Sequence, residues 1–145
     1  MAAAAGIALA AGTAGVTAAV VGAAPPSAGQ SATASPGTVA LAFSAQAPGP
    51  ITAVGSLVPL PWGTGISWEC SYAPGAADYE QPGGSAYYVL VVVARDGAES
   101  TVASWSASPG STVSPTATTS LPVSAIAHVD IRRSADSSTL LRATP

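Results

Sequence analysis

The residues best suited to chemistry lie near the C-terminal end of the sequence. His128 is the only histidine of the chain, and Asp130 follows it two residues later. A histidine next to a carboxylate can serve as a general base, as it does in hydrolases. The chain has no Gly-x-Ser-x-Gly motif, however, and without lysine it has no Ser-x-x-Lys motif. We therefore interpret His128 as an exposed residue of a strand and predict no catalytic residue.

Metal ligands are equally sparse. Cys70 is the only cysteine, so Cys70 and His128 cannot supply the four ligands of a structural zinc site. Asp78 and Glu80 flank Tyr79 in a Gly/Pro-rich segment and could bind Ca²⁺, but a usable site needs six to eight oxygen ligands. We interpret the two carboxylates as solvated loop charges. The sequence predicts neither a metal nor a cofactor.

The single cysteine also excludes a disulfide within the chain. A lone cysteine most often behaves as a small buried hydrophobic residue. We adopt this interpretation for Cys70, and a disulfide to another molecule is the alternative.

Charge is scarce and unevenly distributed. Charged residues make up 8% of the chain, about a third of the usual ~25%. All of them lie between Glu69 and Arg142, and the net charge is −3. Four arginines cannot form the basic surface that phosphate binding requires, so we predict no nucleic-acid partner. The distribution predicts two parts, an uncharged front and a mildly acidic folded domain.

The uncharged front begins with an Ala- and Gly-rich stretch. Residues 2–24 carry no charge, and as a helix they would be about 34 Å long, enough to cross a bilayer. We predict that residues 1–24 form a transmembrane helix or uncleaved signal anchor, with the lipid bilayer as the partner of residues 2–24. Residues 25–37, rich in Pro, Ser and Ala, are predicted to be a linker, because they have no large apolar residue to bury.

A cleaved signal peptide is the alternative for the same stretch. Small residues precede Pro25-Pro26, so cleavage after Ala23 or Ala24 would release a secreted domain. The basic residues that normally open a signal peptide or flank a membrane helix are missing. We therefore expect the chain to be a fragment or to have a mis-called start. Either interpretation puts the remaining residues outside the cell.

The segments that carry these side chains have the residue patterns of strands. Residues 87–93 form an apolar run rich in β-branched and aromatic residues, which predicts a buried strand. Asp96-Gly97 is a strong hairpin signal, and the carboxylates of Asp96 and Glu99 are explained by the turn. The return strand ends at Trp105. This hairpin is predicted to be the centre of the domain.

Two other stretches alternate with period two. Residues 66–72 place Cys70 inward next to Trp68, and residues 127–132 place His128 and Asp130 on a solvent-facing side. Residues 59–65 are predicted to be a loop in which Trp62 folds back over the core edge. Residues 111–121 offer at most one weak edge strand.

Together these patterns predict an all-β fold for residues 38–145. We expect a small antiparallel β-sandwich of six to eight strands, Ig-like, preceded by one apolar helix at the N-terminus. Its predicted core residues are Trp68, Leu90, Val92, Trp105, Val129 and Ile131. Replacing Trp105 by Ala is expected to cost on the order of 3–5 kcal/mol.

The order of segments resembles a known family. The features are PWGTGISWECSY (61–72), YYVLVVVARDGAESTVASW (87–105), TSLPVSAIAHVDIRRS (119–134) and TLLR (139–142), behind an Ala-rich segment and a Pro/Ser spacer. This set resembles the extracytoplasmic C-terminal domain of the zinc-finger anti-sigma factors of high-GC Gram-positive bacteria. The resemblance covers roughly residues 57–142 and the membrane segment.

The resemblance implies a regulatory role. Members of the family hold an extracytoplasmic-function sigma factor at the membrane through a cytoplasmic domain with a His-x3-Cys-x2-Cys zinc motif, which this sequence lacks. A sigma factor is therefore a partner only if a missing N-terminal domain exists. We expect a single-pass membrane protein whose C-terminal domain, outside the cell, senses an envelope signal or a protein partner. The alternative is a secreted β-sandwich binding or structural module.

Overall fold

The computed structural model describes residues 36–74 and 85–145. All of these residues belong to one compact unit, Ser35–Pro145. The predicted anchor 1–24, most of the predicted linker 25–37 and the loop residues Asp78, Tyr79 and Glu80 lie outside the described residues. Across the described ranges, there is no helix whose length and hydropathy would let it span a bilayer.

The described residues form ten strands and a short 3-10 helix, more strands than the six to eight predicted. In chain order they are β1 (Val39–Ala42), β2 (Ser44–Ala45), β3 (Ile51–Leu60), β4 (Gly63–Tyr72), β5 (Ala86–Ala94), β6 (Glu99–Ala107), β7 (Thr112–Val113), β8 (Thr116–Thr119), η3 (Val123–Ala125), β9 (Ile126–Arg133) and β10 (Thr139–Ala143). The surplus comes from strands of two residues, which are too short to leave a pattern in the sequence.

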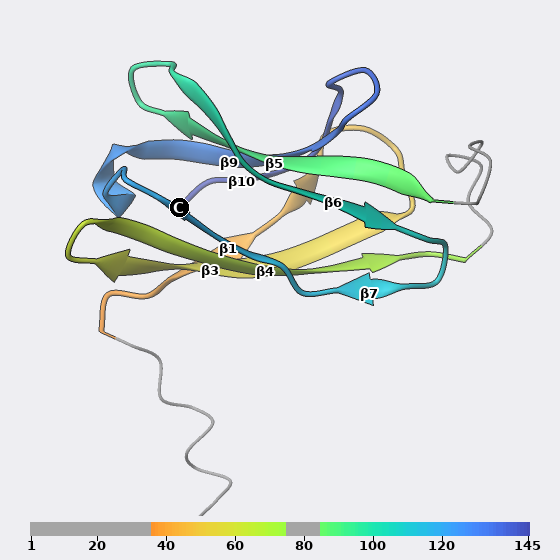
Figure 1. The fold of residues 1–145 in the computed structure, drawn as a ribbon, viewed down its shortest axis with the longest axis horizontal. Coiled ribbons are helices and arrows are strands. Elements are labelled where there is room, and N and C mark those ends of the chain that lie inside the picture. Colours follow the sequence, from red (N-terminus) through yellow and green to blue (C-terminus); the bar gives the residue numbers. More distant parts are fainter. Residues whose placement is uncertain (1–35, 75–84) are drawn as a thin grey trace, which may run out of the picture. The chain divides into compact units, whose positions relative to one another are not determined.

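The strands form two antiparallel sheets of five strands each. Sheet A has the order β1-β3-β4-β7, and β8 also pairs with β4; sheet B has the order β2-β10-β9-β5-β6. Figure 1 shows β3, β4 and β7 in one layer and β5, β6, β9 and β10 in the other. Buried apolar residues from both sheets belong to one core cluster. The all-β prediction is confirmed.

Most of the predicted core residues are buried. Trp68 is 3% exposed, and Leu90, Val92, Val129 and Ile131 are completely buried. Trp105 is the exception, because it is only partly buried and packs against the edge of the cluster. The loss of stability caused by Trp105→Ala is therefore expected to lie at the lower end of the predicted range of 3–5 kcal/mol, at about 3 kcal/mol.

Strand β5 is buried on both sides. Leu90 and Val92 belong to the core cluster, whereas Val91 and Val93, on the opposite face, are also buried. A strand covered on both faces has a continuous apolar run rather than an alternating one. Side chains of the neighbouring strands cover the outer face, because Arg132 of β9 reaches across β5 to hydrogen-bond Glu99 of β6.

The β5–β6 turn forms as predicted. Gly97 has φ of +90°, a conformation that glycine adopts at little cost. The Asp96 side chain accepts a hydrogen bond from the Ala98 N–H at 2.9 Å. The Asp96 carboxylate therefore stabilises the turn.

The predicted loop at residues 59–65 is wrong. Strand β3 continues to Leu60 and β4 begins at Gly63, so only two residues form the turn. Gly63 lies so close to the Thr119 carbonyl that a Cβ would overlap it. The tight turn leaves Trp62 59% exposed, not folded over the core as predicted.

The segment after β6 contains two short strands instead of one. Both β7 and β8 pair with β4, opposite residues 70–71 and 64–67 respectively. The buried Thr64 hydroxyl donates a hydrogen bond to the Leu121 carbonyl at 2.7 Å. This contact holds the segment after β8 against the start of β4.

Candidate functional site

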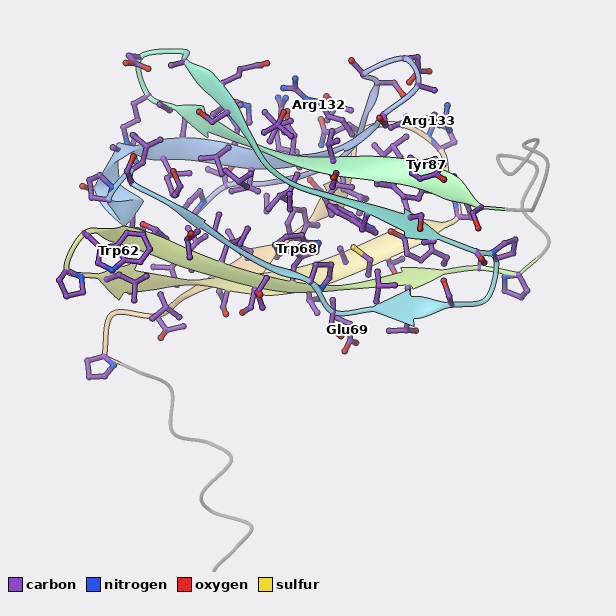
Figure 2. The ribbon with its side chains drawn as sticks, viewed as in Figure 1. Trp62, Trp68, Glu69, Tyr87, Arg132 and Arg133 are labelled. Atoms are coloured by element: carbon purple, nitrogen blue, oxygen red, sulfur yellow. The ribbon has the colours of Figure 1, made fainter. Side chains whose placement is uncertain are left out.

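A cluster of charged side chains lies on the outer face of sheet B, around β9. Val129 and Ile131 face the core, so Asp130 and Arg132 point to the other side of the strand. In the register of the sheet, Asp130 lies opposite Arg142 of β10. Figure 2 shows Arg132 on the outer side of the layer, away from Trp68.

Asp130 is the centre of this cluster. Its Oδ1 accepts a hydrogen bond from Arg142 Nε at 2.7 Å, and its Oδ2 accepts one from Arg142 Nη2 at 3.0 Å. Arg132 donates to Oδ2 through Nη2 at 2.8 Å and through Nε at 3.2 Å. Four N–H donors therefore surround one carboxylate, about as many as its lone pairs accept.

Arg132 connects Asp130 to a second carboxylate on β6. Its Nη1 and Nη2 donate to the two Glu99 oxygens at 2.9 and 2.8 Å, in the paired geometry that suits guanidinium and carboxylate. Asp130, Arg132, Arg142 and Glu99, which we call the arginine–carboxylate network, thus join β6, β9 and β10 over the outer face of β5.

The position of Asp130 corrects the prediction for this strand. The alternating pattern predicted a solvent-facing carboxylate, but Asp130 is completely buried. It does lie on the outer face, where the arginine side chains exclude water from it. Arg132 is itself only 15% exposed. Long arginine side chains can bury neighbouring groups in this way while their charge stays near water.

The network also shifts the pKa values of its members. Burial raises the pKa of Asp130, but the hydrogen bonds from Arg142 and Arg132 outweigh it, so the pKa lies below its ordinary value. The hydrogen bond from Arg132 lowers the pKa of Glu99. Conversely, hydrogen bonds to Glu99 and Asp130 raise the pKa values of Arg132 and Arg142, respectively. All four groups are therefore ionised at neutral pH.

The geometry does not favour catalysis by His128 and Asp130. His128 Nε2 lies 3.8 Å from Asp130 Oδ2, which is too long for a hydrogen bond. Because the arginines already occupy both oxygens of Asp130, this carboxylate has little capacity left to orient an imidazole. The sequence placed the two residues together, and the structure gives Asp130 other partners.

Cys70 lies in the core next to Trp68, as predicted. It is completely buried, and burial raises the pKa of its thiol to about 11. The nucleophilic thiolate is therefore rare at neutral pH. A disulfide to another molecule, the alternative considered from the sequence, would require β4 to open.

Aromatic side chains surround this part of the core. The Trp105 indole N–H donates to the Tyr72 hydroxyl at 2.7 Å. The rings of Trp68 and Trp105 lie 5.4 Å apart, and those of Tyr72 and Tyr88 lie 5.1 Å apart. Aromatic pairs at this spacing stabilise a core beyond their buried area. The hydrogen bond to Tyr72 gives the indole N–H of the half-buried Trp105 a partner.

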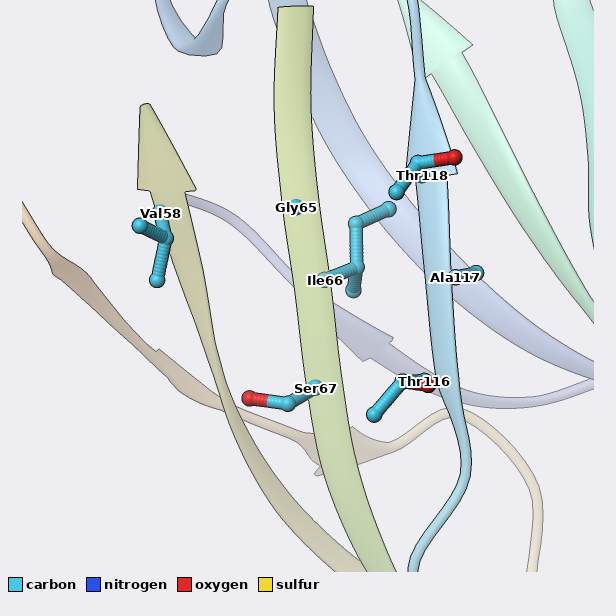
Figure 3. Close-up of a pocket in the computed structure, with 7 residues that line it drawn as sticks. All are labelled: Val58, Gly65, Ile66, Ser67, Thr116, Ala117 and Thr118. Carbon is cyan, nitrogen blue, oxygen red and sulfur yellow. The ribbon is translucent and has the colours of Figure 1, made fainter. Parts of the chain in front are cut away.

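The outer face of sheet A has a different character. An open groove of about 490 Å³ runs between β3, β4 and β8. Figure 3 shows Gly65 at its centre, where a side chain is missing, with Val58 on one side and Thr118 on the other. Hydroxyl and small apolar groups line the groove. None of its lining residues is charged, so the groove offers no acid, base or metal ligand.

Within residues 36–74 and 85–145, no three His, Cys, Asp or Glu side chains gather where they could hold a metal ion. Asp78 and Glu80, the candidate Ca²⁺ ligands, lie outside these ranges. The arginine–carboxylate network is the feature that the sequence did not predict. The sequence contains little indication of this network, because Glu99 and Arg132 are separated by 33 residues.

Comparison with known proteins finds similarity to an anti-sigma factor. The chain is 39% identical over 72 residues to anti-sigma-L factor RslA, found in three strains of Mycobacterium tuberculosis. The match covers 49% of this chain and 26% of RslA, so the chain corresponds to only about a quarter of that protein. No protein-family profile matches the chain, and no solved structure matches it.

Proposed function

We propose that this chain is the extracytoplasmic sensor or regulatory domain of an anti-sigma-factor-like protein. In this proposal residues 2–24 anchor it in the membrane, residues 25–37 form a spacer and residues 38–145 lie outside the cell. The observation that carries it is the 39% identity to an anti-sigma factor over half of the chain. The charge-free N-terminal stretch is consistent with it.

The fold suits a sensor domain that acts by binding. We propose that residues 38–145 form an Ig-like β-sandwich, supported by two antiparallel sheets that share one core. The charges of the arginine–carboxylate network pair with one another inside the domain. The domain would then recognise its signal through its surface. The sigma factor itself would bind to a different part of the protein.

Membrane topology can be tested with an added cysteine. Tyr87 is 58% exposed, so Tyr87→Cys provides an accessible thiol in the full chain. The unsubstituted chain is the matched control, because its Cys70 is buried and protonated. A membrane-impermeant maleimide should label Tyr87→Cys in intact cells. Labelling only after lysis would contradict the extracytoplasmic placement.

The mature N-terminus separates the anchored protein from the secreted alternative. Mass spectrometry of the full chain expressed in a bacterium should find the uncut N-terminus in the membrane fraction. A soluble product that begins at Ala24 or Pro25 would instead favour a secreted module released by signal peptidase.

The sigma partner has a separate test. If the proposal is right, the DNA upstream of the Met1 codon continues the reading frame and encodes a His-x3-Cys-x2-Cys motif. A stop codon directly upstream would remove the sigma factor from the partners of this chain and leave the topology proposal unaffected.

A further inference from the structure

Trp62 is a large apolar side chain at the tip of a tight turn, and it is 59% exposed. It follows Pro59, Leu60 and Pro61 and precedes Gly63, so no charged residue stands next to it in the sequence. Isolated exposed apolar residues are common, but an exposed tryptophan leaves more apolar surface in water than a smaller apolar side chain does. The turn is also held against β8, because Gly63 packs against the Thr119 carbonyl.

The described chain begins at the same end of the domain. Gly37 lies against Pro59 of the same hairpin, where an added Cβ would be 3.2 Å from the proline Cγ. In Figure 1 the start of the described chain and the β3–β4 turn lie at one end of the layers. The segment that leads to residues 2–24 therefore leaves the domain close to Trp62.

The length of this segment limits how far the turn can be from a membrane. If residues 2–24 span the bilayer, residues 25–35 connect them to Pro36. Eleven residues reach at most about 36–40 Å when fully extended, and a flexible chain of that length spans about 17–20 Å on average. A domain held this closely would touch the surface often, with the end that carries Trp62 nearest.

We infer that the Trp62 turn rests in the interfacial layer of the bilayer that anchors the chain. This inference depends on the membrane anchor of the proposed function. Tryptophan favours the interface, because its ring is apolar while its N–H can reach water or headgroups. The docked turn would fix which end of the domain faces outward.

Charge does not drive this docking. The nearby turn of β5–β6 contains Arg95 and Asp96, whose charges balance. Arg95 belongs to the same end, since its Nε donates to the carbonyl of Ser124, in η3, at 2.6 Å. The interaction should therefore depend on the apolar ring and only weakly on the fraction of anionic lipid.

Within residues 36–74 and 85–145, the other exposed aromatic residue provides a matched control. Tyr87 is 58% exposed, almost the same fraction as Trp62. Figure 2 shows it at the opposite end of the layers. A tryptophan at position 87 would be equally accessible to water but directed away from the proposed membrane surface.

The experiment reconstitutes the full chain into vesicles of phosphatidylcholine and phosphatidylglycerol, with or without bromine on the acyl chains. Bromine quenches tryptophan emission only at short range. Trp68 is buried and Trp105 packs against the core, so neither should respond. The chain should lose emission in brominated vesicles, and both Trp62→Phe and Trp62→Phe/Tyr87→Trp should lose much less. Urea unfolding of each variant verifies that it folds.

The outcomes separate this inference from the anchor. If the unsubstituted chain does not float with the vesicles, the anchor fails and the inference fails with it. If the chain floats but Trp62 makes no difference to quenching, the anchor stands and the docked turn is wrong. Equal quenching of the Tyr87→Trp reporter would also overturn it. Protection of Trp62 from acrylamide without bromine quenching would indicate a second copy of the chain as the occupant instead.

Discussion

The two sheets of this domain stabilise their outer faces in opposite ways. Among the five strands of sheet A the only charged residue is Glu69, and its outer face consists mainly of serine, threonine, valine and glycine. Sheet B carries Glu99, Asp130, Arg132 and Arg142, which pair with one another across three strands. One face is nearly neutral and depends on small residues, whereas the other depends on long charged ones.

The two sheets should therefore be sensitive to different substitutions. Sheet A relies on close backbone approach: an added Cβ at Gly55 would lie 2.6 Å from the Ser67 carbonyl oxygen, and Gly63 is tighter still. Sheet B instead covers Val91, Val93 and Asp130 with side chains. Volume should therefore be the sensitive property of sheet A and charge the sensitive property of sheet B.

The largest expected effect is a methyl group added to sheet A. Gly63→Ala should destabilise the fold by on the order of 3 kcal/mol, because a Cβ would overlap the Thr119 carbonyl and push β8 away from β4. Urea unfolding followed by tryptophan fluorescence measures the change. Gly49→Ala is the control, since no atom lies within 4 Å of its Cβ position. Equal stability of the two variants would contradict the dependence on close approach.

The second largest loss of stability is expected when the carboxylate at the centre of the arginine–carboxylate network is removed. Asp130→Ala should cost about 2–3 kcal/mol, because Arg142 loses its carboxylate and Arg132 keeps only Glu99. The matched change on the other sheet, Glu69→Ala, should lie within about 0.5 kcal/mol of the original protein, as for an ordinary surface site. Both free energies of unfolding come from the same urea titration. A similar loss of unfolding free energy in Asp130→Ala and Glu69→Ala would contradict the difference between the two outer faces.

Acid should weaken sheet B through the same residue. The folded pKa of Asp130 lies below its unfolded value, so its stabilising contribution is complete above the unfolded value of about 4 and is lost as the pH falls through the folded pKa. The urea midpoint should therefore fall below pH 4. Asp130→Asn should show a shallower fall, with part remaining because the pKa of Glu99 is also lowered. An unchanged slope would show that Asp130 is not coupled to folding.

The smallest effect concerns the exposed end of the network. Glu99 is half-exposed, so Glu99→Gln should destabilise only slightly, and the difference should shrink as salt screens the ion pair with Arg132. Unfolding titrations at low and high sodium chloride measure this trend. A loss as large as that of Asp130→Ala, or one that salt does not change, would place Glu99 among the buried members.

Residue patterns predicted much of the fold. The apolar run of β5, the Asp96-Gly97 turn and the alternation of β4 each depend on neighbours close in the chain, and each formed as expected. The failures involved distant partners. The turn at Trp62 is short because Gly63 meets Thr119, and nothing between residues 59 and 65 contains that information.

An antiparallel β domain, an inert buried cysteine and the similarity to an anti-sigma factor could all be predicted from the residues, because they follow from composition, local periodicity and residue identity. The burial of Asp130, by contrast, could be seen only in the folded domain. The alternating pattern of residues 127–132 predicted that Asp130 faces water. In the structure it is enclosed by Arg142 from the next strand and by Arg132, which in turn pairs with Glu99 of β6. Burial of a charge depends on which side chains converge on it in space, and strand pairing brings them together from positions far apart in the chain.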